Sequence, residues 1–369
     1  MRRHSEQLLE ALNGSFTRRL FVNVFHGSDR VAEELAFESW SLEGDLGSAV
    51  AVSGSGVVVY PSESGESVAP VGTRGVLSPF RARVELVMEV SAGRFVERVS
   101  LGLFRVVSVP ESRDYTAVVN GLEVVVASRV KISFLSLAED VRRRGFRFPE
   151  VPPQSESCYR ELRRITGMPV METVPDRPIT GNPVWEAKQG GRLEAVQQLA
   201  DQLGGVAVVN SDGAWEVVPD EAGAPVGELA LGARGTVVDV GSEIDTDSVY
   251  NVVVGQFEDE DRNPIYAVAE VRSGDLRPDS LYLETTRYYS SDFVKTQAQA
   301  DSAVQSILAL STGAQLYDVP VQCHVNPLFE LGDVVELTGW VRPVVGRVVK
   351  FSMSDSALMN VTLEVRRSL

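Results

Sequence analysis

Alternating apolar and polar residues dominate positions 16–130. The clearest run extends from Arg81 to Val90. Alternation with a period of two predicts strands with one buried face, and the Asn120-Gly121 step within Tyr115–Val126 predicts a tight hairpin turn. Ser53-Gly54-Ser55-Gly56 lies between two valine-rich runs, and its position and composition predict a second hairpin turn. Short, evenly spaced antiparallel strands are typical of a β-barrel or sandwich.

Patterns typical of helices occur in separate, shorter stretches of the chain. Residues 4–13 are predicted to form a short amphipathic helix that stops at Asn13-Gly14. Ser136–Arg144 and Ser155–Thr166 each open on a serine that can cap a helix. An alanine- and glutamine-rich helix is predicted over Phe293–Leu310. Strand patterns return after it.

These elements predict a mainly β fold with α+β insertions, in which two β-barrel or sandwich domains are joined by a helical connector and a small α/β unit. The predicted divisions are an N-terminal helix over 1–14, a first β domain over 15–130, a helical and proline-rich connector over 131–185, a small α/β unit over 186–245, and a second β domain over 246–369 with an inserted helix over 293–310.

Composition and charge narrow the possible functions. The chain has 369 residues, of which 44% are hydrophobic and 23% charged, as in ordinary globular proteins. Its net charge of −16 disfavours DNA binding through phosphate neutralisation, although an acidic channel would let DNA pass without adsorbing it. No apolar run reaches the roughly 18 residues of a membrane span, and no secretory signal is evident. We therefore expect folding in a cytoplasm and no membrane anchor.

The candidate sites for catalysis or metal binding are poorly supported. The acidic run Glu258, Asp259, Glu260 and Asp261 lacks the alternating oxygen ligands of a calcium loop, so it is interpreted as a solvated hairpin tip. Cys158, Cys323 and His324 have no zinc-site spacing, and both cysteines are expected to be reduced thiols. No HExxH or GxSxG motif is present. We expect no active site, no cofactor and no metal.

One basic concentration stands out in this acidic chain. Arg142, Arg143, Arg144 and Arg147 lie close together, and further arginines follow at 160, 163 and 164. The group is small and lacks interleaved aromatic residues, which argues against nucleic-acid binding. We interpret it as a docking patch for an acidic neighbouring subunit. A solvated helix face is the alternative.

Seven segments along the chain, taken in order, carry a recognisable pattern. They are His4–Gly14, Leu77–Phe80, Val99–Val106, Trp185–Val218, Ser248–Val254, Arg287–Ser291 and Asn326–Val335. In this order they resemble a family of minor tail proteins from phages of Actinobacteria, in the tail-tip or baseplate hub class. The resemblance spans most of the chain, though 29–66 and the proline-rich connector match little.

The resemblance implies a structural protein with two tube-like β domains per chain. It implies a homotrimeric ring in the virion of a siphophage, joining the tail tube and distal tail protein to the tip, near the tape measure and fibre proteins, with DNA only in transit. The acidic tip with Asp245 and Asp247 would then face the lumen or an arginine patch of the next subunit. The alternatives are a distal tail or baseplate adaptor, a cell-wall hydrolase and a glycan binder.

Overall fold

The structure is a computed structural model that describes residues 1–62, 65–233, 235–241, 249–259, 263–291, 294–312, 315–340 and 343–367. Contacts divide the chain into two compact units, which are described separately below. The first comprises Met1–Val240 with Pro320–Leu363, and the second comprises Gly241–Val319 with Glu364–Leu369. Within the described residues, no helix is long and apolar enough to cross a membrane.

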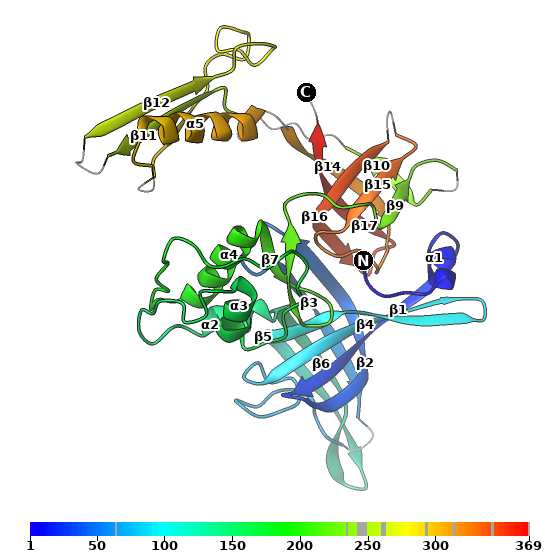
Figure 1. The fold of residues 1–369 in the computed structure, drawn as a ribbon. Helices are drawn as coiled ribbons and strands as arrows, with labels where there is room; N and C mark the ends of the chain where they lie inside the picture. The colour runs from blue at the N-terminus through cyan, green and yellow to red at the C-terminus, as the bar shows by residue number, and fades with distance from the viewer. Residues whose placement is uncertain are drawn as a thin grey trace. The chain divides into compact units, whose positions relative to one another are not determined.

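A closed six-stranded barrel forms the N-terminal part of the first unit (Figure 1). Its strands are β1 (Thr17–His26), β2 (Asp29–Asp45), β3 (Val52–Pro61), β4 (Ala82–Ala92), β5 (Phe95–Val119) and β6 (Leu122–Ser136). They follow the order β1-β4-β5-β6-β3-β2, and the pairing of β1 with β2 closes the ring. Every pairing is antiparallel.

The barrel interior follows directly from the alternating sequence. In β4 the buried positions are Val84, Leu86, Met88 and Val90, and the residues between them are partly exposed. Burying several such side chains supplies the main stabilisation, at roughly 25 cal/mol for each Å² of apolar surface removed from water. Closure also leaves the barrel with no unpaired edge strand.

The predicted hairpin turn at Ser53–Gly56 is wrong. These residues lie inside β3, paired with both β2 and β6. A Cβ at Gly54 would come within 2.5 Å of the Phe134 ring, and one at Gly56 within 2.4 Å of the Phe37 ring. The two glycines therefore make room for large aromatic side chains of the core, where any other residue would collide.

A second six-stranded sheet continues from the barrel. Its strands are β9 (Gly227–Ala230), β10 (Val237–Val240), β14 (Gln315–His324), β15 (Val334–Thr338), β16 (Val344–Ser354) and β17 (Leu358–Arg367), in the order β9-β15-β16-β17-β14-β10. The long strand β2 serves both sheets, since its last residues, Ser41–Asp45, also pair with β16. The predicted mainly β fold is confirmed.

Helices gather in one module beside the barrel. They are α2 (Ala138–Arg143), α3 (Cys158–Thr166) and α4 (Gly191–Leu203), and the hairpin of β7 (Gly205–Val209) and β8 (Trp215–Pro219) follows. Tyr159, Trp185 and Trp215 are almost fully buried in one core shared by all these elements. The stretches predicted as a connector and as an α/β unit thus pack around a common core. The N-terminal helix α1 (Glu6–Leu12) is capped by Ser5.

The second unit has its own sheet and core. Strands β11 (Val252–Glu258), β12 (Pro264–Glu270) and β13 (Thr286–Tyr289) pair in the order β12-β11-β13, and α5 (Gln297–Thr312) covers one face. Ala300 and Val304 of α5 pack against the core around Val253 and Phe257. The insertion between β10 and β14 is therefore larger than the single helix predicted over 293–310. The first residue of that predicted helix, Phe293, lies outside the described residues.

Candidate functional site

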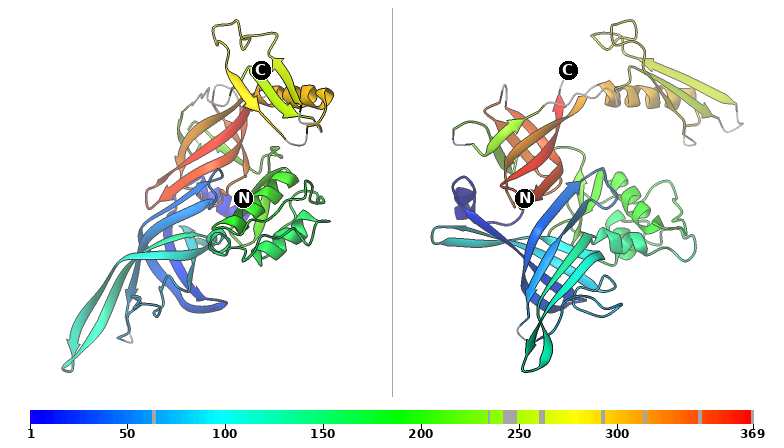
Figure 2. Two further views of the ribbon diagram at one scale, coloured as in Figure 1. Left: turned by 90° about the vertical axis from the view of Figure 1, so that its left-hand side faces the viewer. Right: turned by 180° about the vertical axis from the view of Figure 1, so that it is seen from behind.

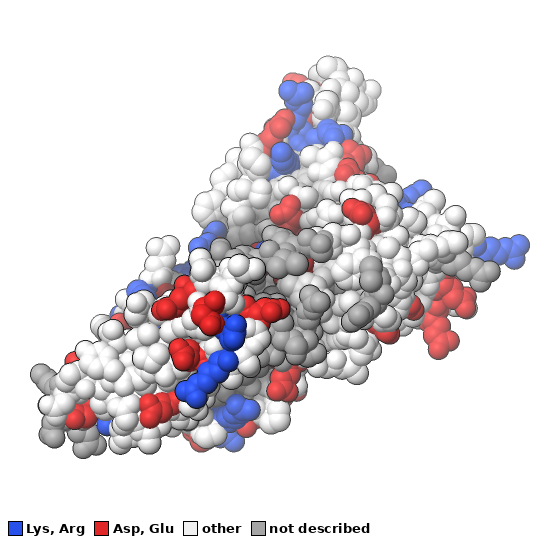
Figure 3. All heavy atoms as spheres, turned by 90° about the horizontal axis from the view of Figure 1, so that it is seen from above, with Lys and Arg blue, Asp and Glu red and all other residues white. Residues whose placement is uncertain are grey.

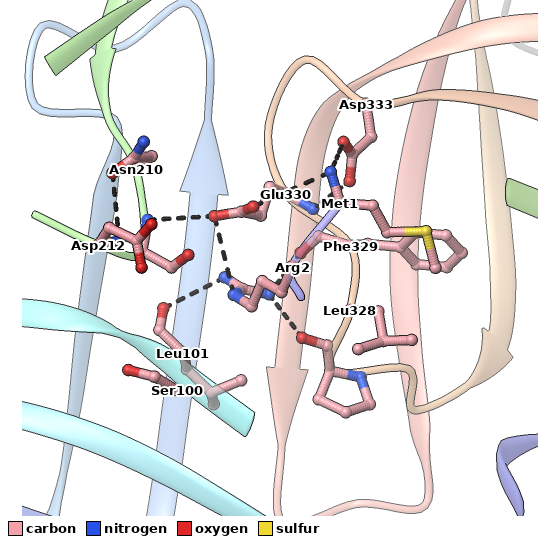
Figure 4. A network of polar contacts seen from close by, with 12 residues as sticks. Met1, Arg2, Ser100, Leu101, Asn210, Asp212, Leu328, Phe329, Glu330 and Asp333 are labelled. Atoms are coloured by element: carbon pink, nitrogen blue, oxygen red, sulfur yellow. Dashed lines mark hydrogen bonds and ion pairs between the residues drawn. The ribbon is translucent and has the colours of Figure 1, made fainter. Parts of the chain in front are cut away.

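The loop between β14 and β15 holds a buried network of polar contacts in the first unit (Figure 4). Arg2 is almost fully buried, and its Nη1 donates hydrogen bonds to the carbonyls of Pro327 and Phe329 at 2.7 and 2.6 Å. Its Nη2 donates to the carbonyl of Leu101 in β5 at 3.2 Å. One guanidinium therefore fastens the loop to the barrel, because its planar set of donors reaches several acceptors at once.

Two carboxylates complete this network. The amino group of Met1 contacts the Asp333 carboxylate, whose Oδ2 accepts a hydrogen bond from the backbone N–H of Glu330 at 2.7 Å. Glu330 Oε1 in turn accepts from the backbone N–H of Ser211, in the β7–β8 turn, at 3.1 Å. We call Met1, Arg2, Leu101, Ser211, Glu330 and Asp333 the junction network. It joins the N-terminal segment, the barrel, the helical module and the second sheet.

Burial and charge set the protonation of these groups. Burial lowers the pKa of Arg2, while the charges of Glu330 and Asp333 raise it. Burial raises the pKa of Asp333, and the N-terminal ammonium acts in the opposite direction. Burial also raises the pKa of Glu216, which accepts a hydrogen bond from Asn210 Nδ2 at 3.0 Å. Within the junction network, the charges of Arg2 and Asp333 are thus offset by partners of opposite charge.

A cavity of about 490 Å³ adjoins the junction network. Glu216, Glu330 and Asp333 line it together with Arg2. A carboxylate pair for acid–base catalysis needs two separated roles and access to a substrate. Here each of the three carboxylates already holds a backbone, amide or ammonium group. The arrangement is suited to holding four parts of the fold together.

Gly332 fixes the shape of the junction loop. Its φ of +89° lies in the left-handed region, and a Cβ there would come within 2.5 Å of Val218 Cγ1. We expect Gly332→Ala to lower the free energy of unfolding by about 2–4 kcal/mol, because backbone strain and overpacking add. Gly93→Ala is the matched control, since its φ of +62° is similar but nothing lies within 4 Å of its Cβ. Denaturant unfolding would contradict this if both variants lost equal stability.

The predicted arginine patch is largely neutralised by its own helix. Arg142 Nε and Arg143 Nε bind the Glu139 carboxylate at 2.5 and 2.6 Å. Arg144 donates instead to the carbonyls of Asp140 and Thr166. Among the described residues, only Arg147 of the four has no hydrogen bond or ion pair. Its role as a contact for an acidic neighbour stays a prediction.

The predicted acidic tip is described only in part. Glu258 ends β11, and its carbonyl accepts a hydrogen bond from Lys295 Nζ at 3.2 Å. Asp259 binds the backbone and side-chain amide groups of Asn263 at 2.7 and 3.0 Å, which stabilises the turn. Glu260 and Asp261 lie outside the described residues, as do Asp245 and Asp247.

Acidic and basic side chains lie next to one another on the face of the molecule drawn in Figure 3. They do not separate there into one acidic and one basic field. Neighbouring charges of opposite sign weaken the long-range potential that a single-signed surface would produce. The charged residues coloured on this face therefore do not form a continuous acidic surface.

Cys158 and Cys323 are both free, in agreement with the expected reduced thiols, and both are buried. Burial raises the pKa of the Cys158 thiol to about 11 and that of Cys323 to about 12. Because only the thiolate is nucleophilic, neither thiol should react with a disulfide reagent at pH 8 in the folded protein. Both should react in guanidinium chloride, where the pKa values return to about 8.5. A thiol that reacts at once in native buffer would contradict this.

The grouping of metal-binding residue types gives no support for a metal site. Among the described residues, no group of three or more His, Cys, Asp or Glu side chains is placed to hold a metal ion. The residues that form the best-connected site, Arg2, Glu330 and Asp333, were not singled out from the sequence. The sequence did single out the segment Asn326–Val335 as part of the family resemblance. In the structure this segment covers most of the loop that carries Glu330 and Asp333 of the junction network.

We compared this architecture with solved protein structures. A tail protein from Neisseria meningitidis MC58 superposes with a TM-score of 0.60 over 95% of this chain and 97% of that one, at 14% identity. The 43 kDa tail protein of prophage MuSo2 from Shewanella oneidensis gives 0.59 over 95% and 98%, at 10% identity. The chain has the fold of phage tail proteins. The predicted resemblance to this class is confirmed at the level of the fold.

A third solved structure is also similar to this chain. A chain of a PdpA–VgrG complex matches with a TM-score of 0.51 at 7% identity, over 95% of this chain and 65% of that one. No family model and no curated protein matches the sequence. In this chain, the junction network links the barrel, the helical module and the second sheet.

Proposed function

We propose that this chain is a structural subunit of a phage tail, acting as a hub at the tail tip or baseplate. The observation that carries the proposal is the superposition on two phage tail proteins along nearly the full length of all three chains. Agreement over full length includes both sheets and the helical module, so it supports a shared architectural role more strongly than a single shared domain would.

In this role the chain forms a homotrimeric ring. Each copy supplies two β modules, the closed barrel and the second six-stranded sheet. Three copies therefore present six modules, which suits a junction between a sixfold tail tube and a threefold tip. Heterologous contacts between identical subunits close into a ring when the rotation between them permits it. The distal tail, tail tube, tape measure and tip or fibre proteins are the proposed neighbours, and DNA passes through the lumen.

The tip of the β5–β6 hairpin is the proposed contact between copies. This ribbon, defined as Tyr115–Ala127, projects from the barrel in Figures 1 and 2. Val118, Val119 and Leu122 are 73%, 50% and 70% exposed. Asn120 and Gly121 have φ values of +52° and +81°, which the predicted tight turn requires. A two-stranded hairpin is marginally stable alone in water, so burial of this apolar ribbon in the assembly would stabilise it.

The distribution of charge favours a second copy of this chain as the partner that covers the ribbon. Two copies that each carry −16 repel one another unless they meet where charge is sparse. Within the ribbon Glu123 is the one charged residue, although charged residues make up 23% of the chain. An apolar contact surface larger than scattered single residues is also what marks protein–protein interfaces.

Image reconstruction of tails that contain this protein tests the proposed position. We expect three copies in a ring at the tip end of the tail tube. Six copies in a ring would indicate a distal tail or adaptor protein, and clearing of cell-wall material in a zymogram would indicate a hydrolase. Either result would contradict the hub function.

A further inference from the structure

A cavity of about 550 Å³ lies between the barrel and the helical module of the first unit. Arg83 of β4 and Arg105 of β5 line it from the barrel. Arg143 and Arg144, at the end of α2, line it from the helical module. Four arginine residues thus line one cavity that is open to the surface, in a chain whose net charge is negative.

The two barrel arginines share a single carboxylate. Arg83 Nη2 lies 2.8 Å from Asp140 Oδ2, and Arg105 Nη1 lies 2.5 Å from Asp140 Oδ1. Arg105 Nε is buried and has no hydrogen-bond partner among the described residues. A guanidinium carries five N–H donors, so both arginines keep donors that Asp140 does not use. A buried donor without a partner is a cost that a bound acceptor would remove.

The two helical arginines also keep unused donors. Arg143 binds Glu139 through Nε at 2.6 Å, and Arg142 shares that carboxylate. Arg144 is held by neutral carbonyls through Nε and Nη2. The lining therefore contains four arginines, against the two carboxylates of Asp140 and Asp212.

Apolar side chains complete the lining. Leu103 and Leu137 face the cavity beside Met168 and Pro169. Ligand sites commonly combine an apolar lining with a few convergent polar groups, in volumes of roughly 300–1,000 Å³. A carboxylate fits the fork geometry of arginine, and an apolar portion fits the rest of the lining.

We propose that this cavity is a binding site for a carboxylate joined to a short apolar group. Two sources share that chemistry. One is an aspartate or glutamate flanked by apolar residues in another polypeptide, and the other is a free aliphatic carboxylic acid. The site does not depend on the proposed place of the protein in a tail.

Calorimetric titration of the full chain at low salt tests the site. The probes are hexanoate, acetate, hexanol and the peptide acetyl-Leu-Asp-Leu-amide. Hexanoate or the peptide should bind at least about tenfold more tightly than acetate and hexanol, since only they supply both the charge and the apolar contact. The tighter of the two identifies the source. Saturable binding of neither, or equal binding of all four, would overturn the proposal.

Matched variants locate the binding. Arg105→Gln and Arg143→Gln should each raise the Kd of the tighter probe by about tenfold, the effect of one charge-assisted hydrogen bond. Arg143→Gln leaves Glu139 paired with Arg142, so it remains informative if Arg105→Gln fails to fold. Arg160→Gln is the control, because Arg160 is exposed and pairs with Glu156 on the surface of α3. A Kd unchanged in both cavity variants would place any binding elsewhere and refute the site.

Discussion

Arg2→Met is expected to lower the free energy of unfolding by about 3–5 kcal/mol, the usual effect of removing one partner from a buried ionic network. The variant leaves the carbonyls of Leu101, Pro327 and Phe329 without their donor. It also leaves the Glu330 carboxylate without the nearby guanidinium, whose Nε lies 3.9 Å away. Chemical denaturation followed by circular dichroism measures the change.

Arg3→Met is the matched control for this prediction. Arg3 is the next residue and carries the same charge, but it is exposed. Exposed substitutions usually change stability by no more than about 0.5 kcal/mol. If the two variants unfold at the same denaturant concentration, the junction network does not hold the first unit together in the way described.

Placing a charge pair on the hairpin ribbon should abolish assembly without unfolding the chain. Val119 and Leu122 face each other across the turn, so Val119→Lys with Leu122→Glu places opposite charges on neighbouring strands. Such a pair supports the hairpin itself and leaves the net charge unchanged. In the proposed trimer it would be buried away from water, which costs several kcal/mol for each ion. Sedimentation should therefore show monomers, and circular dichroism should show that these monomers remain folded.

A control for the ribbon variant uses exposed apolar residues outside the ribbon. Val71 and Phe80 are 81% and 67% exposed. Val71→Lys with Phe80→Glu introduces the same two charged residues into the segment between β3 and β4 and should leave assembly intact. Trimers that persist in the ribbon variant would exclude the ribbon as the contact between copies.

The sequence predicted the barrel strands where alternation was regular. Val84–Val90 and the Asn120-Gly121 turn follow from local pattern alone. The predicted turn at Ser53–Gly56 was wrong because serine and glycine are typical both of turns and of strand positions beneath large aromatic rings. The rings concerned belong to Phe37 and Phe134, which are distant in sequence, so the local pattern could not reveal them. Strand β2 was obscured by its polar residues, since it lies at the seam of two sheets with much of its length exposed.

The junction network was beyond sequence reasoning for a different reason. Arg2 binds carbonyl groups about 325 residues further along the chain, and a backbone acceptor leaves no trace in residue type. The arginine patch, in contrast, carried a readable signal. Glu139 precedes Arg142 and Arg143 by three and four residues, the spacing at which helical side chains pair. That spacing predicts local neutralisation.

The native mass of the purified protein at high concentration tests the central claim most directly. A homotrimeric hub predicts a species of three times the 40.1 kDa chain mass, visible as a closed ring in micrographs of the same sample. A strictly monomeric species under these conditions, with no ring in the micrographs, would contradict the proposed function.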